Sequence, residues 1–331
     1  MKKIALVTGG AGFIGSHMVD LLLSKKYKVR VIDNLIGGHK KNLSHHKNNP
    51  NLKFNKFDIC KLKPDNKFFK NVDYVFHFAG IGDIVPSIEN PIKYMMTNTQ
   101  GTINVLESAR YAKVKKFIYA ASASCYGITK KPVRENFKIS LEHPYALSKY
   151  LGEKSVLHWH KVYGLPVNSI RIFNAYGKRV RTTGAYGAVI GVFFKQKISN
   201  KPLTVVGDGK QSRDFVHVTD VAKAFLSAAK TKYIGRIYNV GTGKNQNINF
   251  LTELIGGKKV FIPDRPGESK NSCANISKIK KELRWKPSVN FRDGITDMLK
   301  EIHKWKDAPL WTPKKISKAT RNWFNYISKS K

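Results

Sequence analysis

The chain has 331 residues, 41% of them hydrophobic and 11% aromatic, which is enough for one large domain or for two that share a core. It carries 60 Lys and Arg against 22 Asp and Glu, a net charge of +38, and these residues are spread evenly along the chain. A nucleic-acid-binding protein usually concentrates such charge in a patch or a tail. We therefore interpret the charge as a compositional bias, with a basic surface for anionic substrates or nucleic acid as the alternative.

Several protein classes are disfavoured by simple patterns. The apolar start of the chain resembles a signal peptide, but Thr8 and the two glycines after it interrupt the apolar run, so we reject that interpretation. No apolar run approaches the roughly 18 residues of a membrane helix. The cysteines Cys60, Cys125 and Cys273 are odd in number and far apart, which argues against a disulfide framework or a zinc site. We expect a cytoplasmic protein in a reducing compartment.

The first half of the chain alternates short apolar runs with helical patterns, which predicts βαβ units and a parallel sheet. The predicted strands are Ile4–Thr8, Tyr27–Asp33, Leu52–Phe57, Tyr74–Phe78, Phe117–Ala121 and Val167–Phe173. The predicted helices are Gly15–Ser24, residues 91–112 and residues 145–163. After Gly177 the turns GDGKQ and GTGKN separate shorter elements of mixed type. We expect one domain over residues 1–177 and a smaller mixed α/β region mainly over 178–331, with a soft boundary and chain crossings.

A glycine-rich turn, TGGAGFIGS at residues 8–16, joins the first predicted strand to the first predicted helix. Gly9, Gly12 and Gly15 lie where a dinucleotide-binding motif requires them, because the bare backbone can approach a pyrophosphate and the helix N-terminus supplies free N–H groups. Asp33 follows Gly15 by 18 residues, at the end of the second predicted strand. A carboxylate there accepts hydrogen bonds from a ribose 2′-OH and repels a 2′-phosphate. This predicts a Rossmann-type, doubly wound sheet that binds NAD rather than NADP.

Two further strand ends are candidates for cofactor contacts. Asp58 follows the third predicted strand, where it would contact the adenine; an exposed loop acid is the alternative. Phe78, Ala79 and Gly80 end the fourth predicted strand, where small residues leave room for a cofactor, and a simple turn is the alternative.

Tyr145 and Lys149 form a YxxxK pattern, and positions four residues apart share one face of a helix. An ammonium near a phenol stabilises the phenolate and lowers its pKa from about 10, which yields a base near neutral pH. Pro144 suits the first turn of this helix. Ser122 lies 23 residues before Tyr145, after the fifth predicted strand, where strand ends line the crevice of such a sheet. Its hydroxyl is our candidate partner for the substrate oxygen, with Ser124 as the competitor.

The motifs TGGAGFIGS, DNL, HFAG, SASCYG, YALSK and RIFNAYG follow one another along the chain. As a set they resemble the extended short-chain dehydrogenase/reductase family. More narrowly, the chain is similar to the NAD-dependent nucleotide-sugar epimerases and dehydratases, and most of all to UDP-glucose and UDP-N-acetylglucosamine 4-epimerases. The similarity runs from residue 1 to about 300, and the last 30 residues do not match the core pattern of the family.

In that family the tyrosine takes the proton of the sugar 4-OH while the C4 hydride passes to NAD⁺. A 4-keto sugar forms, rotates, and receives the hydride on its other face. Tyr145, Lys149 and Ser122 match the positions of this machinery. The resemblance also implies cofactor contacts from Phe13, Ile14, Asn34, Ile59 and Asn98.

The resemblance also implies a site for the nucleotide sugar. Asn174 matches a residue that binds its phosphates, and Arg213 and Arg265 match two arginines whose guanidinium groups clamp the diphosphate. Glu268 matches an acid that contacts the uridine ribose; surface charges are the alternative for these three ionic residues. Ser272 falls where a bulky aromatic residue in some 4-epimerases limits the pocket, so its small side chain should leave space for an N-acetyl group.

Differences between this sequence and the motifs of the family indicate to which branch of the family the chain belongs. Sugar 4,6-dehydratases carry Asp-Glu directly after the catalytic Ser or Thr, whereas Ala123 and Ser124 stand here, and neither can be a general acid. Decarboxylating relatives commonly keep a Glu at the position of Ser124. Of the reactions of the family, this leaves oxidation and reduction at C4 without elimination, which is epimerisation.

The remaining histidines and tryptophans have less specific patterns. We expect His45 and His46, in a polar loop, to be solvated. His158 and His160 point to different sides of a helix, which disfavours a shared metal, and we expect them to face a partner subunit or solvent. Trp305, Trp311 and Trp323, with lysines between them, would form either an interaction tail or a helix that packs back on the body.

Taken together, the sequence predicts a reversible C4 epimerase of a UDP-hexose or UDP-N-acetylhexosamine, with NAD as the cofactor and its site in the cleft between the two regions. Family members pair through the helices that here span 91–112 and 145–163, so we expect a homodimer and no membrane association. One alternative is a UDP-glucuronate epimerase. Another is a nucleotide-binding scaffold that binds RNA, which has no need of Ser122, Tyr145 and Lys149.

Overall fold

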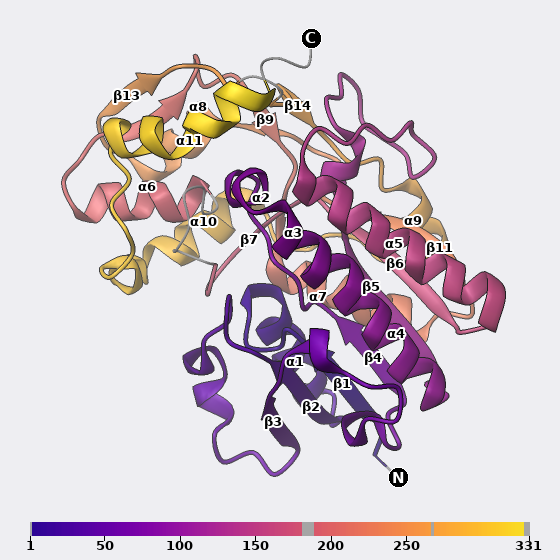
Figure 1. The fold of residues 1–331 in the computed structure, drawn as a ribbon. Helices are drawn as coiled ribbons and strands as arrows, with labels where there is room; N and C mark the ends of the chain where they lie inside the picture. The colour runs from indigo at the N-terminus through magenta and orange to yellow at the C-terminus, as the bar shows by residue number, and fades with distance from the viewer. Residues whose placement is uncertain (1, 181–188, 266–267, 328–331) are drawn as a thin grey trace.

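A computed structural model of the chain describes residues 2–180, 189–265 and 268–327. Its centre is a seven-stranded sheet in the order β3-β2-β1-β4-β5-β6-β11 (Figure 1), and all the pairings within it are parallel. The strands are β1 (Ile4–Thr8), β2 (Lys28–Asp33), β3 (Leu52–Lys56), β4 (Tyr74–His77), β5 (Lys116–Ser122), β6 (Val167–Ile172) and β11 (Arg236–Val240). The strand order reverses between β1 and β4, which is where doubly wound sheets bind ligands. The predicted Rossmann-type fold is confirmed.

The six strands predicted from the sequence are all present, and their ends differ by at most one residue from the prediction. Three of these segments, β1, β4 and β5, are short and mostly apolar runs, and such runs form strands that are buried on both faces. In β1, for example, Ala5, Leu6 and Val7 are fully buried.

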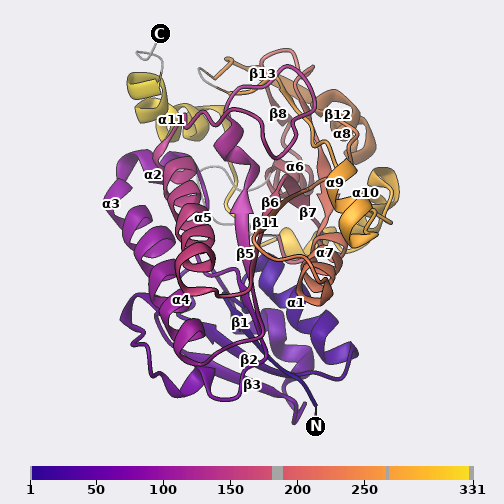
Figure 2. The same cartoon turned by 90° about the vertical axis from the view of Figure 1, so that its right-hand side faces the viewer.

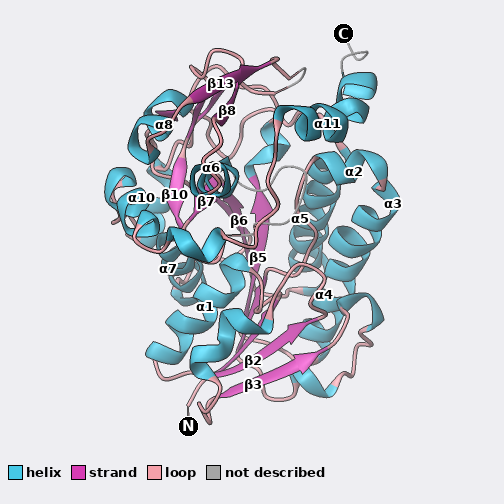
Figure 3. Ribbon diagram, turned by 90° about the vertical axis from the view of Figure 1, so that its left-hand side faces the viewer, coloured by secondary structure: helices cyan, strands magenta, loops and turns pink. Residues whose placement is uncertain are grey.

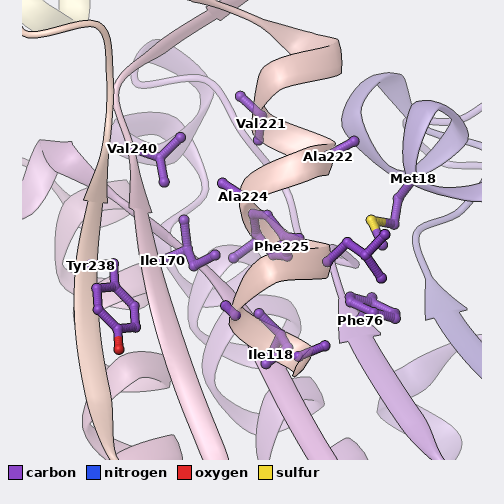
Figure 4. Close-up of a cluster of buried hydrophobic side chains, with 14 of the residues drawn as sticks. Met18, Phe76, Ile118, Ile170, Val221, Ala222, Ala224, Phe225, Tyr238 and Val240 are labelled. Carbon is purple, nitrogen blue, oxygen red and sulfur yellow. The ribbon is translucent and has the colours of Figure 1, made fainter. Parts of the chain in front are cut away.

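Helices cover both faces of the sheet (Figure 2). On one face lie α1 (Phe13–Ser24) and α7 (Val218–Lys230), and on the other α4 (Gly101–Tyr111) and α5 (Pro144–Tyr163). Figure 4 shows how α7 packs: Phe225 and Val221 lie among Ile118, Ile170 and the side chains of β11, with Met18 of α1 beside them. This core joins residues from both halves of the chain.

The predicted helix over residues 91–112 is divided into three parts. It consists of α3 (Pro91–Tyr94), a π-helical turn η4 (Met95–Gln100) and α4. Single π turns inside α-helices frequently occur at functional sites. Here the turn carries Asn98, whose side chain is fully buried and bonds the backbone of Ile81 in both directions, at 2.7 and 3.0 Å. A short helix that the sequence did not predict, α2 (Val85–Glu89), precedes it.

The second half of the chain contributes both to the large sheet and to a separate layer. Besides α7 and β11, it holds β7 (Asn174–Tyr176), α6 (Val189–Ile198), β8 (Leu203–Val206), β9 (Ser212–Arg213), β10 (Phe215–His217), β12 (Gln246–Asn247), α8 (Ile248–Ile255), β13 (Lys259–Ile262), β14 (Asn271–Ser272), α9 (Ser277–Leu283) and α10 (Phe291–Leu299). Its strands form three small sheets, β10-β7, β12-β9-β14 and β13-β8. The division of the chain at residue 177 stays a prediction, since α7 and β11 cross back.

The C-terminal segment packs against the body of the protein. It consists of a 3₁₀ turn, η6 (Ile302–Trp305), and helix α11 (Pro313–Ile327). Trp305 and Trp323 are each only 3% exposed, and α11 lies against α2 (Figures 2 and 3). Of the two alternatives for this segment, a helix that packs back is therefore the one observed. Within the described part of the chain, no helix has the length and apolarity to cross a bilayer.

Candidate active site

A cleft of about 970 Å³ lies at the carboxyl ends of the central strands, between them and the smaller sheets. It brings together nearly all the residues predicted for the site. Those that line it are Gly9, Gly12, Phe13, Ile14, Gly15, Asp33, Asn34, Ile59, Phe78, Ala79, Gly80, Ser122, Tyr145, Lys149, Asn174, Arg213, Arg265, Glu268 and Ser272. Only Asp58 and Asn98, among the predicted site residues, are not part of its wall.

The glycine-rich turn has the close backbone packing that its sequence predicts. Gly9 has a φ of +68°, a conformation that favours glycine. A Cβ on Gly15 would lie 2.1 Å from the carbonyl oxygen of Gly9, so no larger residue fits without moving the turn. Helix α1 starts at Phe13 with Gly12 as its N-cap, and no side chain caps it. The first amides of α1 therefore face the cleft free for an anion.

Asp33 ends β2 and anchors the loop beside the glycine turn. Its carboxylate accepts hydrogen bonds from the backbone N–H of Ala11, at 2.9 Å, and of Leu35, at 2.8 Å. Burial raises the pKa of Asp33, while these two N–H donors and the nearby His39 lower it. Each carboxylate oxygen can accept a second hydrogen bond, so the group remains able to bind a ribose hydroxyl.

Asp58 and Asn98 lie behind the cleft wall and hold residues that line it. The Asp58 carboxylate accepts from the backbone N–H of Cys60 at 2.9 Å and from the Asn34 side chain at 3.3 Å. It is therefore a cap of a short 3₁₀ turn and a support for Asn34, rather than an exposed loop acid. Asn98 also donates to the hydroxyl of Ser148 at 2.9 Å, so it fixes the start of the catalytic helix against the 81–82 loop.

Helix α5 positions Tyr145 and Lys149. Pro144 is its first residue, as predicted, and His143 is its N-cap, accepting from the N–H of Ala146 at 3.2 Å. The backbone N–H of Tyr145 donates to the hydroxyl of Ser87 in α2, at 3.1 Å. These contacts fix the first turn of the helix, which carries the phenol into the cleft.

Burial has the largest effect on the pKa values of Tyr145 and Lys149. It raises the pKa of Tyr145, which the hydrogen bond between Tyr145 and Ser122 lowers in part. It also lowers the pKa of Lys149 to about 7, with Glu153 acting in the opposite direction. The sequence predicted that Lys149 would hold the pKa of Tyr145 below 10. In the protein alone this pKa is raised instead, because desolvation of the phenolate has the largest effect on it. The Lys149 ammonium instead lies over the ring of Tyr119, 4.4 Å from its centre.

Ser122 and Ser124 form a pair at the end of β5. The Ser122 hydroxyl donates to that of Ser124 at 3.0 Å and accepts from the Ser124 backbone N–H at 3.1 Å. Since Ser122 is the residue that bonds Tyr145, it is the better candidate for contact with the substrate oxygen. Ser124 orients it.

Two arginines and a glutamate form an ionic cluster in the wall of the cleft. Arg213 in β9 bonds one oxygen of Glu268 at 2.6 Å, and Arg265 bonds the other at 3.3 Å. Ser272 is the β14 partner of Arg213 in the sheet, which places its small side chain beside this cluster. The two guanidinium groups are thus held side by side at the cleft, an arrangement that suits a diphosphate.

His143 is a site residue that the sequence analysis missed. Its ring lines the cleft and stacks on that of Tyr145, with 6.0 Å between centroids and 4° between planes. Burial lowers its pKa to about 4, so it is neutral near pH 7. The proline after it marked position 143 as an N-cap, and this was the available signal.

The structure corrects two expectations for other histidines. His45 and His46 are not merely solvated, because both bond one oxygen of Asp20, at 2.8 and 2.9 Å. The other oxygen of Asp20 is bonded by Arg179. His158 is exposed, as expected, but His160 bonds the backbone oxygen of Leu165 at 2.9 Å and so fixes the end of α5 rather than facing a partner.

Comparison with known proteins agrees with this geometry. The sequence model described as "NAD dependent epimerase/dehydratase family" matches residues 5–241. The chain belongs to this family. It is therefore an NAD-dependent enzyme of the extended short-chain dehydrogenase/reductase type, within its group of nucleotide-sugar epimerases.

Individual relatives cover most of the chain. A putative UDP-glucose 4-epimerase of Methanocaldococcus jannaschii is 39% identical over 88% of this chain and 95% of its own length. The UDP-N-acetylglucosamine 4-epimerase of Methanobrevibacter ruminantium M1, solved with UDP-N-acetylmuramic acid, has a TM-score of 0.87 and 33% identity over 92% of this chain and 99% of that one. The UDP-glucuronic acid 4-epimerase of Bacillus cereus, solved with UDP-glucuronic acid and NAD, has a TM-score of 0.84 and 31% identity, covering 91% and 99%.

Proposed function

We propose that the protein reversibly inverts C4 of a UDP-hexose or UDP-N-acetylhexosamine through a 4-keto intermediate. One observation carries the proposal: a single cleft holds the glycine turn with Asp33, the Ser122–Tyr145 pair and the Arg213–Arg265 cluster. The chain's residues fit NAD, since the turn offers free amides to a pyrophosphate and Asp33 offers a ribose acceptor. When bound there, NAD would supply the hydride acceptor for oxidation of the sugar and the hydride donor for its reduction.

In the proposed reaction each side chain of the cleft has a separate role. Arg213 and Arg265 hold the diphosphate, and so leave the sugar free to turn between the two hydride transfers. Ser122 bonds the 4-oxygen of the sugar, and Tyr145 takes its proton and later gives it back. Lys149 is buried one helical turn beyond Tyr145, so in its charged form it would favour the phenolate when the sugar is oxidised.

Epimerisation without elimination fits the residues at the end of β5. Ala123 and Ser124 line the cleft directly after Ser122, where a dehydratase of this family has two acids. Neither side chain can exchange a proton at C5 or C6 of a sugar near neutral pH.

Turnover of a panel of sugar nucleotides tests the proposal. Purified protein is incubated with UDP-, dTDP-, GDP- and CDP-sugars, UDP-glucuronate included, and the products are resolved by NMR. We expect C4 epimers of UDP-sugars, and we expect Tyr145→Phe to lose roughly 10²- to 10⁴-fold in kcat, the usual value of acid–base catalysis. Intact turnover in Tyr145→Phe, or dehydrated or decarboxylated products, would refute the proposal.

Because the side chain of Ser272 is small, we expect the protein to accept N-acetylated sugars. This side chain lines the cleft beside Arg213, and a serine leaves the space that a bulky residue would fill. We expect Ser272→Tyr to abolish turnover of UDP-N-acetylglucosamine while turnover of UDP-glucose continues. Equal loss of both activities would contradict this role.

We also propose a homodimer and a cytoplasmic location. The helices α3, α4 and α5 expose apolar side chains, among them Ile92 at 74%, Tyr111 at 63% and Val162 at 53%. A second copy pairing through the same helices would cover them. All the cysteines are free thiols, in keeping with a reducing compartment. Light scattering of the wild type and of Val162→Glu tests the dimer, which the charge should weaken.

A further inference from the structure

A cluster of polar side chains outside the cleft brings two histidines and a carboxylate together. His45 and His46 end the 3₁₀ segment η1 (Lys40–His46), and Asp20 lies on α1. The Nε2 atoms of both histidines lie against Oδ1 of Asp20, at 2.8 and 2.9 Å. The centres of the two imidazole rings are 4.1 Å apart. One possible ligand atom from each of the three side chains thus lies within 4.8 Å of the others.

These are donor atoms that divalent transition metals bind. Imidazole nitrogen and carboxylate oxygen atoms bind Zn²⁺ at roughly 2.0–2.2 Å, so two ligands of one ion lie roughly 3.0–3.4 Å apart. The two Nε2–Oδ1 distances would therefore have to lengthen by at most about 0.6 Å. The side chains are accessible, with exposed fractions of 49% for His45, 29% for Asp20 and 19% for His46. An ion can therefore reach the cluster from solvent.

The other oxygen of Asp20 is held by Arg179. The guanidinium bonds Oδ2, which leaves Oδ1 turned toward the histidines. Carboxylates that bind metals are themselves held by hydrogen bonds of this kind. The positive charge of Arg179 also opposes a cation, so we expect weaker binding than at a structural zinc site with four protein ligands. The nearby His17 is already engaged, because its Nε2 bonds the backbone oxygen of Lys178 at 2.9 Å and its Nδ1 bonds Arg179 at 3.1 Å.

The segment that carries the two histidines is packed against the glycine-rich turn. The backbone oxygen of Ala11, in that turn, accepts from the N–H of His39 at 3.0 Å and from the Asn42 side chain at 2.8 Å. Arg179 donates to the backbone oxygen of Asn42 at 3.0 Å. An ion at the end of η1 would therefore fasten this segment to α1, beside the turn that is the candidate cofactor site.

We propose that Asp20, His45 and His46 bind a divalent transition-metal ion such as Zn²⁺, which fastens η1 to α1 and so strengthens the cofactor site. Oδ1 of Asp20 and the two Nε2 atoms supply the ligands, and water completes the coordination. The ion takes the place of the Nε2 protons, and each neutral imidazole keeps its one proton on Nδ1. None of the three side chains lines the cleft, so the ion acts on the structure and not on the substrate.

Titration of Zn²⁺ and of Co²⁺ into chelator-treated, NAD-loaded protein without an affinity tag tests the site. We expect one ion per chain, with Co²⁺ giving visible absorption bands. His45→Gln and His46→Gln each remove one ligand and leave the bond between Asp20 and Arg179. Each should weaken binding by at least the roughly 10- to 100-fold that the loss of an outer-shell partner costs. His158→Gln is the matched control, since His158 is exposed on α5 and the variant should bind the ions as the wild type does.

Unfolding temperature and NAD release give two further readouts. Zn²⁺ at about 100 times its Kd should raise the unfolding temperature of the wild type by roughly 5 °C, and should leave that of His45→Gln and His46→Gln unchanged. NAD should leave the wild type more slowly with Zn²⁺ than with chelator, and at one rate in each variant. Each variant is compared with itself, with and without metal, so the loss of a hydrogen bond to Asp20 is not mistaken for the loss of the ion.

Three results would overturn the site: no ion bound by the wild type, undiminished binding in both His45→Gln and His46→Gln, or an equal loss in His158→Gln. Binding of Zn²⁺ with no change in NAD release would overturn the link to the cofactor site. None of these outcomes depends on which sugar nucleotide the protein acts on.

Discussion

A buried ion pair one helical turn beyond Lys149 offers a direct test of how the candidate site is held. Glu153 in α5 is 1% exposed and Arg171 in β6 is 3% exposed. Nη2 of Arg171 lies 2.5 Å from Oε1 of Glu153, and the Arg171 Nε atom lies 3.1 Å from both carboxylate oxygens. Ser169 donates to the same carboxylate at 2.8 Å. Burial alone would lower the pKa of Arg171, but the bonds to Glu153 raise it, so the guanidinium stays charged inside the protein.

Glu153→Gln keeps the shape of the side chain and removes its charge. The Arg171 cation would then be buried without a counter-charge, which costs about 3–5 kcal/mol in comparable pairs. In large domains a loss of 1 kcal/mol in the free energy of unfolding lowers the unfolding temperature by roughly 2 °C, so we expect a fall of about 6–10 °C. Differential scanning calorimetry of the wild type and the variant measures this.

The double variant Glu153→Gln with Arg171→Met is the control. Because it removes the unpaired cation, it should regain a large part of the stability lost in Glu153→Gln. A loss below about 1 kcal/mol in the single variant, or strictly additive losses in the double variant, would refute the argument. A second consequence concerns catalysis: Glu153 raises the pKa of Lys149, so Glu153→Gln should lower that pKa further.

Two further predictions concern the lysine and the glycine turn. Burial lowers the pKa of Lys149 from its ordinary 10.5 to about 7, so between these pH values the unfolded chain binds more protons than the folded one. Wild-type stability should therefore rise with pH over this window relative to Lys149→Met, as urea unfolding at pH 7 and pH 10 would show; parallel values in both proteins would contradict it. Gly15→Ala would place a methyl group 2.1 Å from the Gly9 oxygen. We therefore expect the variant to unfold at a lower temperature and to retain no NAD on purification. Full NAD occupancy of the variant would disprove this.

The parts of the fold that depend on local pattern could be predicted from the sequence. The strands β1, β4 and β5 are mostly apolar runs, and the glycine turn and Asp33 follow directly from β1 and β2. The YxxxK spacing needs only the period of a helix. For these features the residues that interact are close in sequence, or the parallel sheet brings its strand ends to one edge.

The parts that depend on long-range contacts could not be predicted. Nothing in the spacing of Glu153 and Arg171 shows that they pair, since the contact requires α5 to pack on β6. The role of Asn98 behind the cleft wall arises from a π turn that the helical pattern does not reveal. For Trp311 and Trp323 the sequence left an interaction tail open beside a helix that packs back, because their place in the cleft depends on how the C-terminal segment crosses it.

The two catalytic pKa shifts have one cause, and together they describe how the site is activated. Burial disfavours charge on both groups, so it raises the pKa of Tyr145 and lowers that of Lys149. Near pH 7 the first proton to leave this pair therefore leaves the amine, and the phenol remains protonated until a neighbouring charge changes the balance. On the proposed function, a cationic ring in the adjacent cofactor site would favour the phenolate, and a sugar hydroxyl bonded to Ser122 would offer the proton to be moved. We therefore expect, on the proposed function, the phenolate base to form only when cofactor and sugar are bound.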